Sequence, residues 1–224
     1  MVSRLISKMG VAALAALAIV GCMSASTPTE AKNEMAAKPV VQSDQASAIF
    51  AGGCFWCIES DMDGLNGVIS TTSGYTAGSL PNPTYKTHSK GKAAHYEAVQ
   101  VVYDPKILSY DALLTAFWHS VDVTDDGGQF CDRGDSYRTA VFATAEQRPA
   151  AEASKAALAD LDWPKAPVLT PILPVSEFFP AEVYHQDYHT KNPIRYRYYR
   201  NGCGRDKRVK AVWGPLARKG LPTH

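Results

Sequence analysis

Two cysteines, Cys54 and Cys57, follow a pair of glycines and are the residues of this chain best suited to nucleophilic or redox chemistry. The short apolar run 47–50 before the glycines predicts a buried strand, and residues 54–62 predict the first turns of a helix. The positive end of a helix and its free backbone N–H groups favour an anion. We therefore expect the pKa of Cys54 to be lowered, so that a thiolate is available as a nucleophile.

The neighbours of Cys54 suggest what such a nucleophile would meet. Gly52 and Gly53 permit a tight turn and a close approach of substrate. Phe55 and Trp56 provide apolar, aromatic surface beside the sulfur, which suits a methyl group next to the reacting atom.

Other interpretations of the cysteines stay open at this point. Cys54 can be a buried structural residue, or Cys54 and Cys57 can act together as a thioredoxin-like dithiol. A zinc site with His185 and His189 is disfavoured, because the cysteine and histidine pairs lie much further apart in the chain than in zinc fingers. We expect no metal, and we expect the two histidines on one helix face near the surface.

The surrounding segments alternate between strand and helix patterns. Strands are expected at 47–50, 68–75, 96–103, 137–143 and, interrupted by proline, 167–176, and helices at 54–62, 110–120, 144–161 and 181–190. Two long polar loops, 80–92 and 121–136, have the composition of functional loops. Because there is no clean parallel repeat, we expect an α+β fold: a two-layer mixed-sheet domain of ferredoxin-like or α–β roll type with long active-site loops.

The amino-acid composition and net charge limit the kinds of protein that this chain can be. The chain has 224 residues, 46% hydrophobic, and a formal net charge of +1. This is an ordinary globular composition, too balanced in charge to indicate a nucleic-acid partner. We expect one catalytic domain at 47–213, followed by a loose tail at 214–224.

The N-terminal segment has the order of an export signal. Arg4 and Lys8 precede an apolar run that is too short to span a bilayer comfortably, and residues 1–21 therefore predict a signal peptide. The end of the run, Gly21-Cys22, resembles a bacterial lipobox, which implies cleavage before Cys22 and a lipid on its thiol. A plain signal peptide with an incidental cysteine is the alternative. Residues 22–46 predict a flexible tether, and we expect an exported protein on the periplasmic side of a membrane.

Several ordered motifs between residues 47 and 213 carry a family resemblance. They are Gly-Cys-Phe-Trp at 53–56 followed by Glu59, Pro83-Thr84-Tyr85, His95-Tyr96-Glu97-Ala98-Val99, the polar segment 129–138, and Gly202-Cys203-Gly204. Together they resemble the A-type peptide methionine sulfoxide reductases.

The resemblance implies roles for particular residues. Cys54 would attack the sulfoxide sulfur, and Glu97 would act as the general acid that protonates the departing oxygen. Tyr85 and Tyr137 would hold that oxygen, and Asp132 would lie beside the site. Phe55 and Trp56 would contact the substrate, the S epimer of methionine sulfoxide, either free or in oxidised proteins.

The resemblance also implies a redox cycle. Attack leaves Cys54 as a sulfenic acid, which a second thiol converts to a disulfide. Cys203 matches the resolving position, Cys57 is the second choice, and Cys131 is expected to be structural. A thioredoxin-like protein or dithiothreitol would supply reducing equivalents, and no bound cofactor is expected. The alternatives for the whole protein are a Cys54–Cys57 dithiol–disulfide oxidoreductase and a non-catalytic lipoprotein binding module.

Overall fold

The computed structural model describes residues 34–222. The expected signal peptide, Cys22 and the first part of the expected tether lie outside these residues. The strands are β1 (Ala46–Gly52), β2 (Val68–Thr76), β3 (Tyr96–Tyr103), β4 (Gly128–Gln129), β5 (Asp132–Arg133), β6 (Thr139–Ala143), β7 (Ile172–Pro174) and β8 (Phe178–Pro180). The α-helices are α1 (Phe55–Asp63), α2 (Tyr110–Trp118), α3 (Arg148–Ala157), α4 (Tyr188–Lys191), α5 (Pro193–Gly202) and α6 (Arg205–Trp213).

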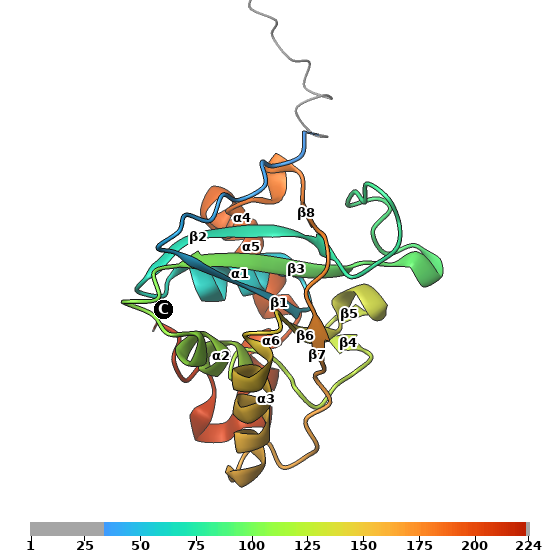
Figure 1. Cartoon of the computed structure of the whole chain (residues 1–224). Coiled ribbons are helices and arrows are strands. Elements are labelled where there is room, and N and C mark those ends of the chain that lie inside the picture. Colours follow the sequence, from blue (N-terminus) through green and yellow to red (C-terminus); the bar gives the residue numbers. More distant parts are fainter. Residues whose placement is uncertain (1–33, 223–224) are drawn as a thin grey trace, which may run out of the picture.

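A mixed six-stranded sheet forms the centre of the domain (Figure 1). Its order is β7-β6-β1-β3-β2-β8, and the pairs are antiparallel except for β6 and β7. A separate hairpin joins β4 to β5. The predicted α+β fold is confirmed.

The two faces of the sheet carry different clusters because side chains alternate along each strand. On one face, Phe50 packs with residues of α1, α2 and α6 in the main core and stacks on Phe117 at 4.9 Å between ring centroids. On the other face, Ile49 and Ala51 belong to a smaller cluster with Phe142. Among residues 34–222, no helix has the length and apolar character needed to cross a bilayer.

The C-terminal third differs most from the sequence expectations. The helix expected at 181–190 is instead a 3₁₀ turn, Val183–His185, followed by α4, because Asp187 adopts a left-handed φ of 53° between them. The strand expected at 167–176 is reduced to β7, and the helix expected at 144–161 begins at Arg148 with Pro149 in its first turn. Helices α5 and α6 were not expected.

A buried carboxylate, Asp61 of α1, holds this C-terminal region in place. It pairs with Arg200 of α5 at 3.0 Å, with Arg205 of α6 at 3.7 Å and with Arg218 at 2.9 Å. Arg205 also donates to the carbonyls of Gly52 and Ser120. Residues 214–222, expected as a loose tail, therefore pack against the domain.

The first described residues also pair with the domain. Met35 forms an antiparallel bridge with Glu182, and Figure 1 shows this segment running beside the chain that follows β8. The N–H of Ala36 donates to Ala181, and the N–H of Val183 donates to Glu34. This short pairing lies in the middle of segment 22–46, so the expectation of a flexible tether is wrong for residues 34–36.

Candidate active site

Cys54 lies at the junction between β1 and α1, as predicted. Gly53 has a φ of +83°, and a Cβ there would lie 2.6 Å from Gln129, so the tight turn needs glycine for both conformation and space. Cys54 is the N-cap of α1, and its side chain is 7% exposed. The turn therefore presents the sulfur at the positive end of a helix.

The predicted lowering of the Cys54 pKa is wrong for this structure. Burial raises the pKa of Cys54 well above its usual value, and the neighbouring Cys57 and Glu97 raise it further, although a hydrogen bond from Tyr199 opposes them. The first N–H of the helix, that of Phe55, donates to Glu97 and not to the sulfur.

Cys57 lies one helical turn from Cys54 and is affected in the opposite direction. A hydrogen bond with Cys54 lowers the pKa of Cys57 despite burial, and the charges of Arg205 and Arg200 add to the lowering. Negative charge is therefore favoured on Cys57 over Cys54.

Glu97 reaches the site from β3, where it is 2% exposed. Its Oε2 accepts the N–H of Phe55 at 3.0 Å, which brings the carboxyl to the start of α1. Burial raises the pKa of Glu97, while a hydrogen bond with His88 and the charge of His88 oppose that rise. A carboxyl in such surroundings can retain a proton closer to neutral pH than an exposed one.

A small cavity of about 60 Å³ joins the predicted residues. Its lining consists of Cys54, Phe55, Trp56, Tyr85, Glu97, Asp132, Tyr137 and Tyr199. Burial raises the pKa of Tyr85 to about 12 and raises those of Tyr137 and Tyr199 as well, so all three hydroxyls remain donors. The cavity therefore combines a thiol, an acid and three hydroxyl donors in a space for only a few heavy atoms.

The aromatic wall of the cavity is fixed by residues outside it. Trp56 stacks on Tyr188 at 3.8 Å and donates its indole N–H to His185 at 3.1 Å. Glu182 accepts the N–H of Tyr85 and the hydroxyl of Tyr75, each at 3.0 Å. His185 is buried beside this wall, which corrects the expectation that it lies on a surface helix face with His189.

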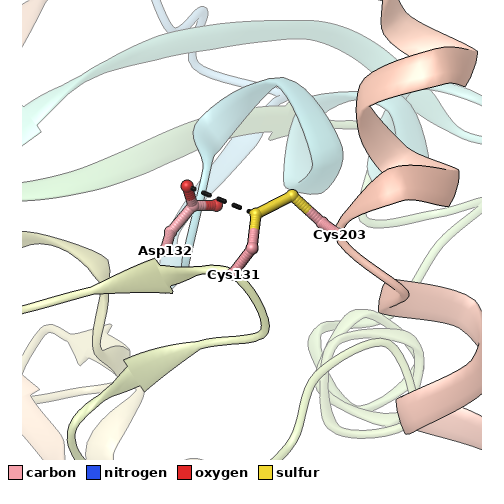
Figure 2. Close-up of side chains that lie close together, drawn as sticks. All are labelled: Cys131, Asp132 and Cys203. Atoms are coloured by element: carbon pink, nitrogen blue, oxygen red, sulfur yellow. Dashed lines mark hydrogen bonds between the residues drawn. A yellow bond between two sulfur atoms is a disulfide. The ribbon is translucent and has the colours of Figure 1, made fainter.

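The other two cysteines are joined in a disulfide. Cys131, just before β5, bonds to Cys203 at the end of α5, with their Cα atoms 4.9 Å apart. Figure 2 shows Asp132 beside this bond, with one carboxylate oxygen 3.8 Å from the sulfur of Cys131. The other oxygen of Asp132 accepts the hydroxyl of Tyr199. The cross-link thus lies directly behind one wall of the cavity.

Among the described residues, the positions of the cysteines, histidines and carboxylates show which of them are close enough to share a metal ion. There, the histidine, cysteine and carboxylate side chains close enough to share an ion are Cys131, Asp132 and Cys203, and two of these are bonded to each other. The histidines weighed for zinc have other partners, since His185 accepts from Trp56 and His189 lies 3.6 Å from Asp63. The geometry supports thiol chemistry.

Comparison with known proteins agrees with this chemistry. The family model described as peptide methionine sulfoxide reductase matches residues 46–216. The chain belongs to the peptide methionine sulfoxide reductase family. The reductase is 54% identical over 168 residues to the peptide methionine sulfoxide reductase MsrA 2 of Caulobacter vibrioides, covering 75% of this chain and 85% of the relative. It is 48% identical over 168 residues to MsrA of Bacillus licheniformis, covering 75% and 93%.

Solved structures show the same fold. The reductase matches methionine sulfoxide reductase A of Corynebacterium diphtheriae with a TM-score of 0.60 and 27% identity, covering 75% of this chain and 91% of that one. It matches the reduced form of Mxr1 from Saccharomyces cerevisiae with a TM-score of 0.64 and 28% identity, covering 69% and 90%. Its activity is that of a peptide-methionine (S)-S-oxide reductase.

Sequence reasoning missed two residues of the site. Tyr199 lines the cavity from α5, a helix that was not expected. His88 lies against Glu97 from the loop between β2 and β3, in which the sequence motif singles out Tyr85 and not His88. The sequence does contain a signal for His88, because a histidine in a loop otherwise rich in small and polar residues is a candidate functional residue.

Proposed function

We propose that the reductase binds the sulfoxide end of an S-epimer methionine sulfoxide, free or in an oxidised protein, in the 60 Å³ cavity. The single observation that carries this proposal is the convergence of Cys54, Glu97 and three tyrosine hydroxyls on that cavity. Phe55 and Trp56 offer apolar contact to the methyl group. The substrate oxygen would face the hydroxyls of Tyr85 and Tyr137.

The reaction begins with the Cys54 thiolate, formed when the proton passes to Cys57. The thiolate attacks the sulfoxide sulfur, and Glu97 delivers a proton to the sulfoxide oxygen. The oxygen is transferred to Cys54 as a sulfenic acid, and methionine leaves with its sulfur reduced. The high pKa values of the tyrosines support their role as hydrogen-bond donors, because each keeps its proton through the step.

Cys57 is our proposed resolving residue, ahead of Cys203. The packing of Cys54 and Cys57 in one small buried cluster supports this order, as does the bond that already joins Cys203 to Cys131. Cys57 would give up the proton that it took from Cys54 and attack the sulfur of the sulfenic acid, and the hydroxyl would leave with that proton as water. The resulting Cys54–Cys57 disulfide would be reduced by thiol–disulfide exchange with a thioredoxin-like protein or dithiothreitol.

The same cysteine pair also favours one second function, general dithiol–disulfide exchange on other proteins. The thioredoxin-like spacing and the lowered pKa of Cys57 support it. An insulin-reduction assay separates the two functions, since a sulfoxide reductase turns over one epimer of methionine sulfoxide and leaves insulin unreduced.

The resolving assignment is tested by one equivalent of substrate in the absence of reductant. We expect disulfide mapping of the full chain to give a Cys54–Cys57 bond beside an unchanged Cys131–Cys203 bond. Cys57→Ser should release one equivalent of methionine and accumulate a sulfenic acid that dimedone labels. Cys54→Ser should release no methionine. A Cys54–Cys203 bond in the wild type would overturn the assignment and restore Cys203.

We also propose that the reductase is exported and attached to a membrane through a lipid on Cys22. The order of charge, apolar run and Gly21-Cys22 supports this. Labelling of the full chain with a fatty acid analogue in a bacterial host should depend on Cys22. Equal labelling of Cys22→Ser would contradict the proposal.

A further inference from the structure

The buried ring of His88 lies against the carboxyl of Glu97. His88 Nε2 is 3.4 Å from Glu97 Oε1, and each side chain is 2% exposed. The two residues come from different elements, since His88 belongs to the loop between β2 and β3 and Glu97 belongs to β3. Two ionisable groups this close and this buried interact strongly through their charges.

The contact of His88 Nδ1 determines the protonation pattern of the ring, whose Nε2 faces Glu97. His88 Nδ1 lies 3.0 Å from the carbonyl oxygen of Tyr85, and a carbonyl can only accept, so Nδ1 carries a hydrogen. Nε2 is therefore the nitrogen that can gain or lose a proton. Among the described residues it has no hydrogen-bond partner of good geometry, which leaves Glu97 as its nearest acidic neighbour.

His88 and Glu97 are shielded from water, and the ionisable groups around them include uncharged tyrosines. The ring of His88 stacks on Tyr75 at 4.9 Å and meets the edge of Tyr137 at 6.3 Å. The ionisable groups that face the pair are Tyr75, Tyr85, Tyr137, Cys54, Asp132 and His185. All these tyrosines stay neutral at physiological pH because burial raises their pKa values.

We propose that His88 is the proton partner of Glu97 and that the two side chains hold one mobile proton between Nε2 and Oε1. This rests on the proposed role of Glu97 as the acid. When the sulfoxide oxygen takes a proton from Glu97, the mobile proton leaves the pair, so that His88 ends neutral and Glu97 ends as a carboxylate. Solvent then restores one proton to the pair. His88 is a positioning residue, because it acts through Glu97 and does not touch substrate.

This arrangement predicts how the pH dependence of the first turnover changes. Burial raises the pKa of Glu97, and the imidazole of His88 next to the carboxyl lowers it. Removing Nε2 should let the pKa of Glu97 rise, so Glu97 stays protonated to higher pH. The alkaline limb of the single-turnover rate should therefore move up by about one pH unit or more.

Two substitutions separate the contact with Glu97 from the contact with Tyr85. His88→Asn retains a donor near the position of Nδ1 but lacks Nε2, and it should show the full alkaline shift. His88→Gln retains an N–H near the position of Nε2, and it should shift the limb by less than half as much. His95→Asn is the matched control, because His95 is equally buried but its ring nitrogens bond to the backbone of Gly78 and Leu80 and not to Glu97.

An alkaline limb in His88→Asn that matches the wild type, or an equal shift in His95→Asn, would overturn the proposal. Glu97→Gln distinguishes failure of the underlying function, since a wild-type first turnover in that variant removes Glu97 as the acid altogether.

Discussion

At the scale of single residues, the cavity relies on hydroxyls that burial keeps protonated. Tyr137→Phe should slow the first turnover by roughly 10- to 100-fold, because one of the two proposed donors to the developing charge on oxygen is lost while Tyr85 remains. Rapid-quench measurement of methionine release tests this. Tyr198→Phe is the control, since Tyr198 is 84% exposed, and it should leave the rate unchanged. Equal rates in all three proteins would exclude Tyr137 from oxygen binding.

A buried carboxyl on the active-site helix, Glu59, gives a pH-dependent prediction. Burial raises the pKa of Glu59 to about 7, and among residues 34–222 neither carboxylate oxygen has a hydrogen-bond partner. Below about pH 4 the carboxyl is protonated in both folded and unfolded chains, so it has no effect on stability there. As pH rises towards 7, the unfolded chain ionises first, and stability falls.

The expected penalty for Glu59 above pH 7 is about 3 kcal/mol. Glu59→Gln should therefore gain about that much stability relative to the wild type between pH 4 and pH 8, measured by urea unfolding at both values. Glu152→Gln is the control, because Glu152 is exposed on α3. A stability difference between variant and wild type that does not change with pH would contradict a raised pKa.

Residues named from a local sequence motif are the ones that the structure brings together at the cavity. Cys54, Glu97, Tyr85 and Tyr137 could be named because each stands in a short characteristic segment. The pKa of Cys54 could not be predicted in the same way. The helix end was visible in the sequence, but the burial of the sulfur and the closeness of Glu97 depend on β3, which is distant in the chain.

At the scale of elements, the Cys131–Cys203 disulfide joins the β4–β5 hairpin to α5. The bond closes a segment with a sequence separation of 72, and chain entropy predicts a stabilisation of about 4 kcal/mol. Cys131→Ala with Cys203→Ala should lose stability of this order in urea unfolding without reductant. Dithiothreitol should destabilise the wild type but not the double variant, and a wild type indifferent to dithiothreitol would show that the bond does not form.

Element prediction failed for α5 for a specific reason. Its residues are mainly tyrosine and arginine, so no apolar stripe marks a buried face. Its buried side chains, Tyr196 and Arg200, are inside because Arg200 meets Asp61 and donates to the hydroxyl of Tyr196. Strands β1, β2, β3 and β6 were predictable because runs of apolar, β-branched and aromatic residues mark them locally, whereas the short strands β4, β5 and β8 carry no such pattern.

At the scale of the whole molecule, Asp61 connects α1 to α5, α6 and the C-terminal segment through three arginines. Asp61→Asn should destabilise the fold by about 3–5 kcal/mol, because it leaves Arg205, 1% exposed, without its carboxylate. Chemical unfolding measures this loss. Asp160→Asn, at an exposed position, should change stability little. An equal effect of both substitutions would argue against the central role of Asp61.

The pairing of residues 34–36 with residues 181–183 limits where the chain can be truncated. Glu182 in that segment holds the backbone of Tyr85, so a truncation that removes Glu34 to Ala36 strips support from a catalytic loop far away in sequence. Truncated versions and fusions should therefore place their junction before Glu34, even though the family match begins only at residue 46.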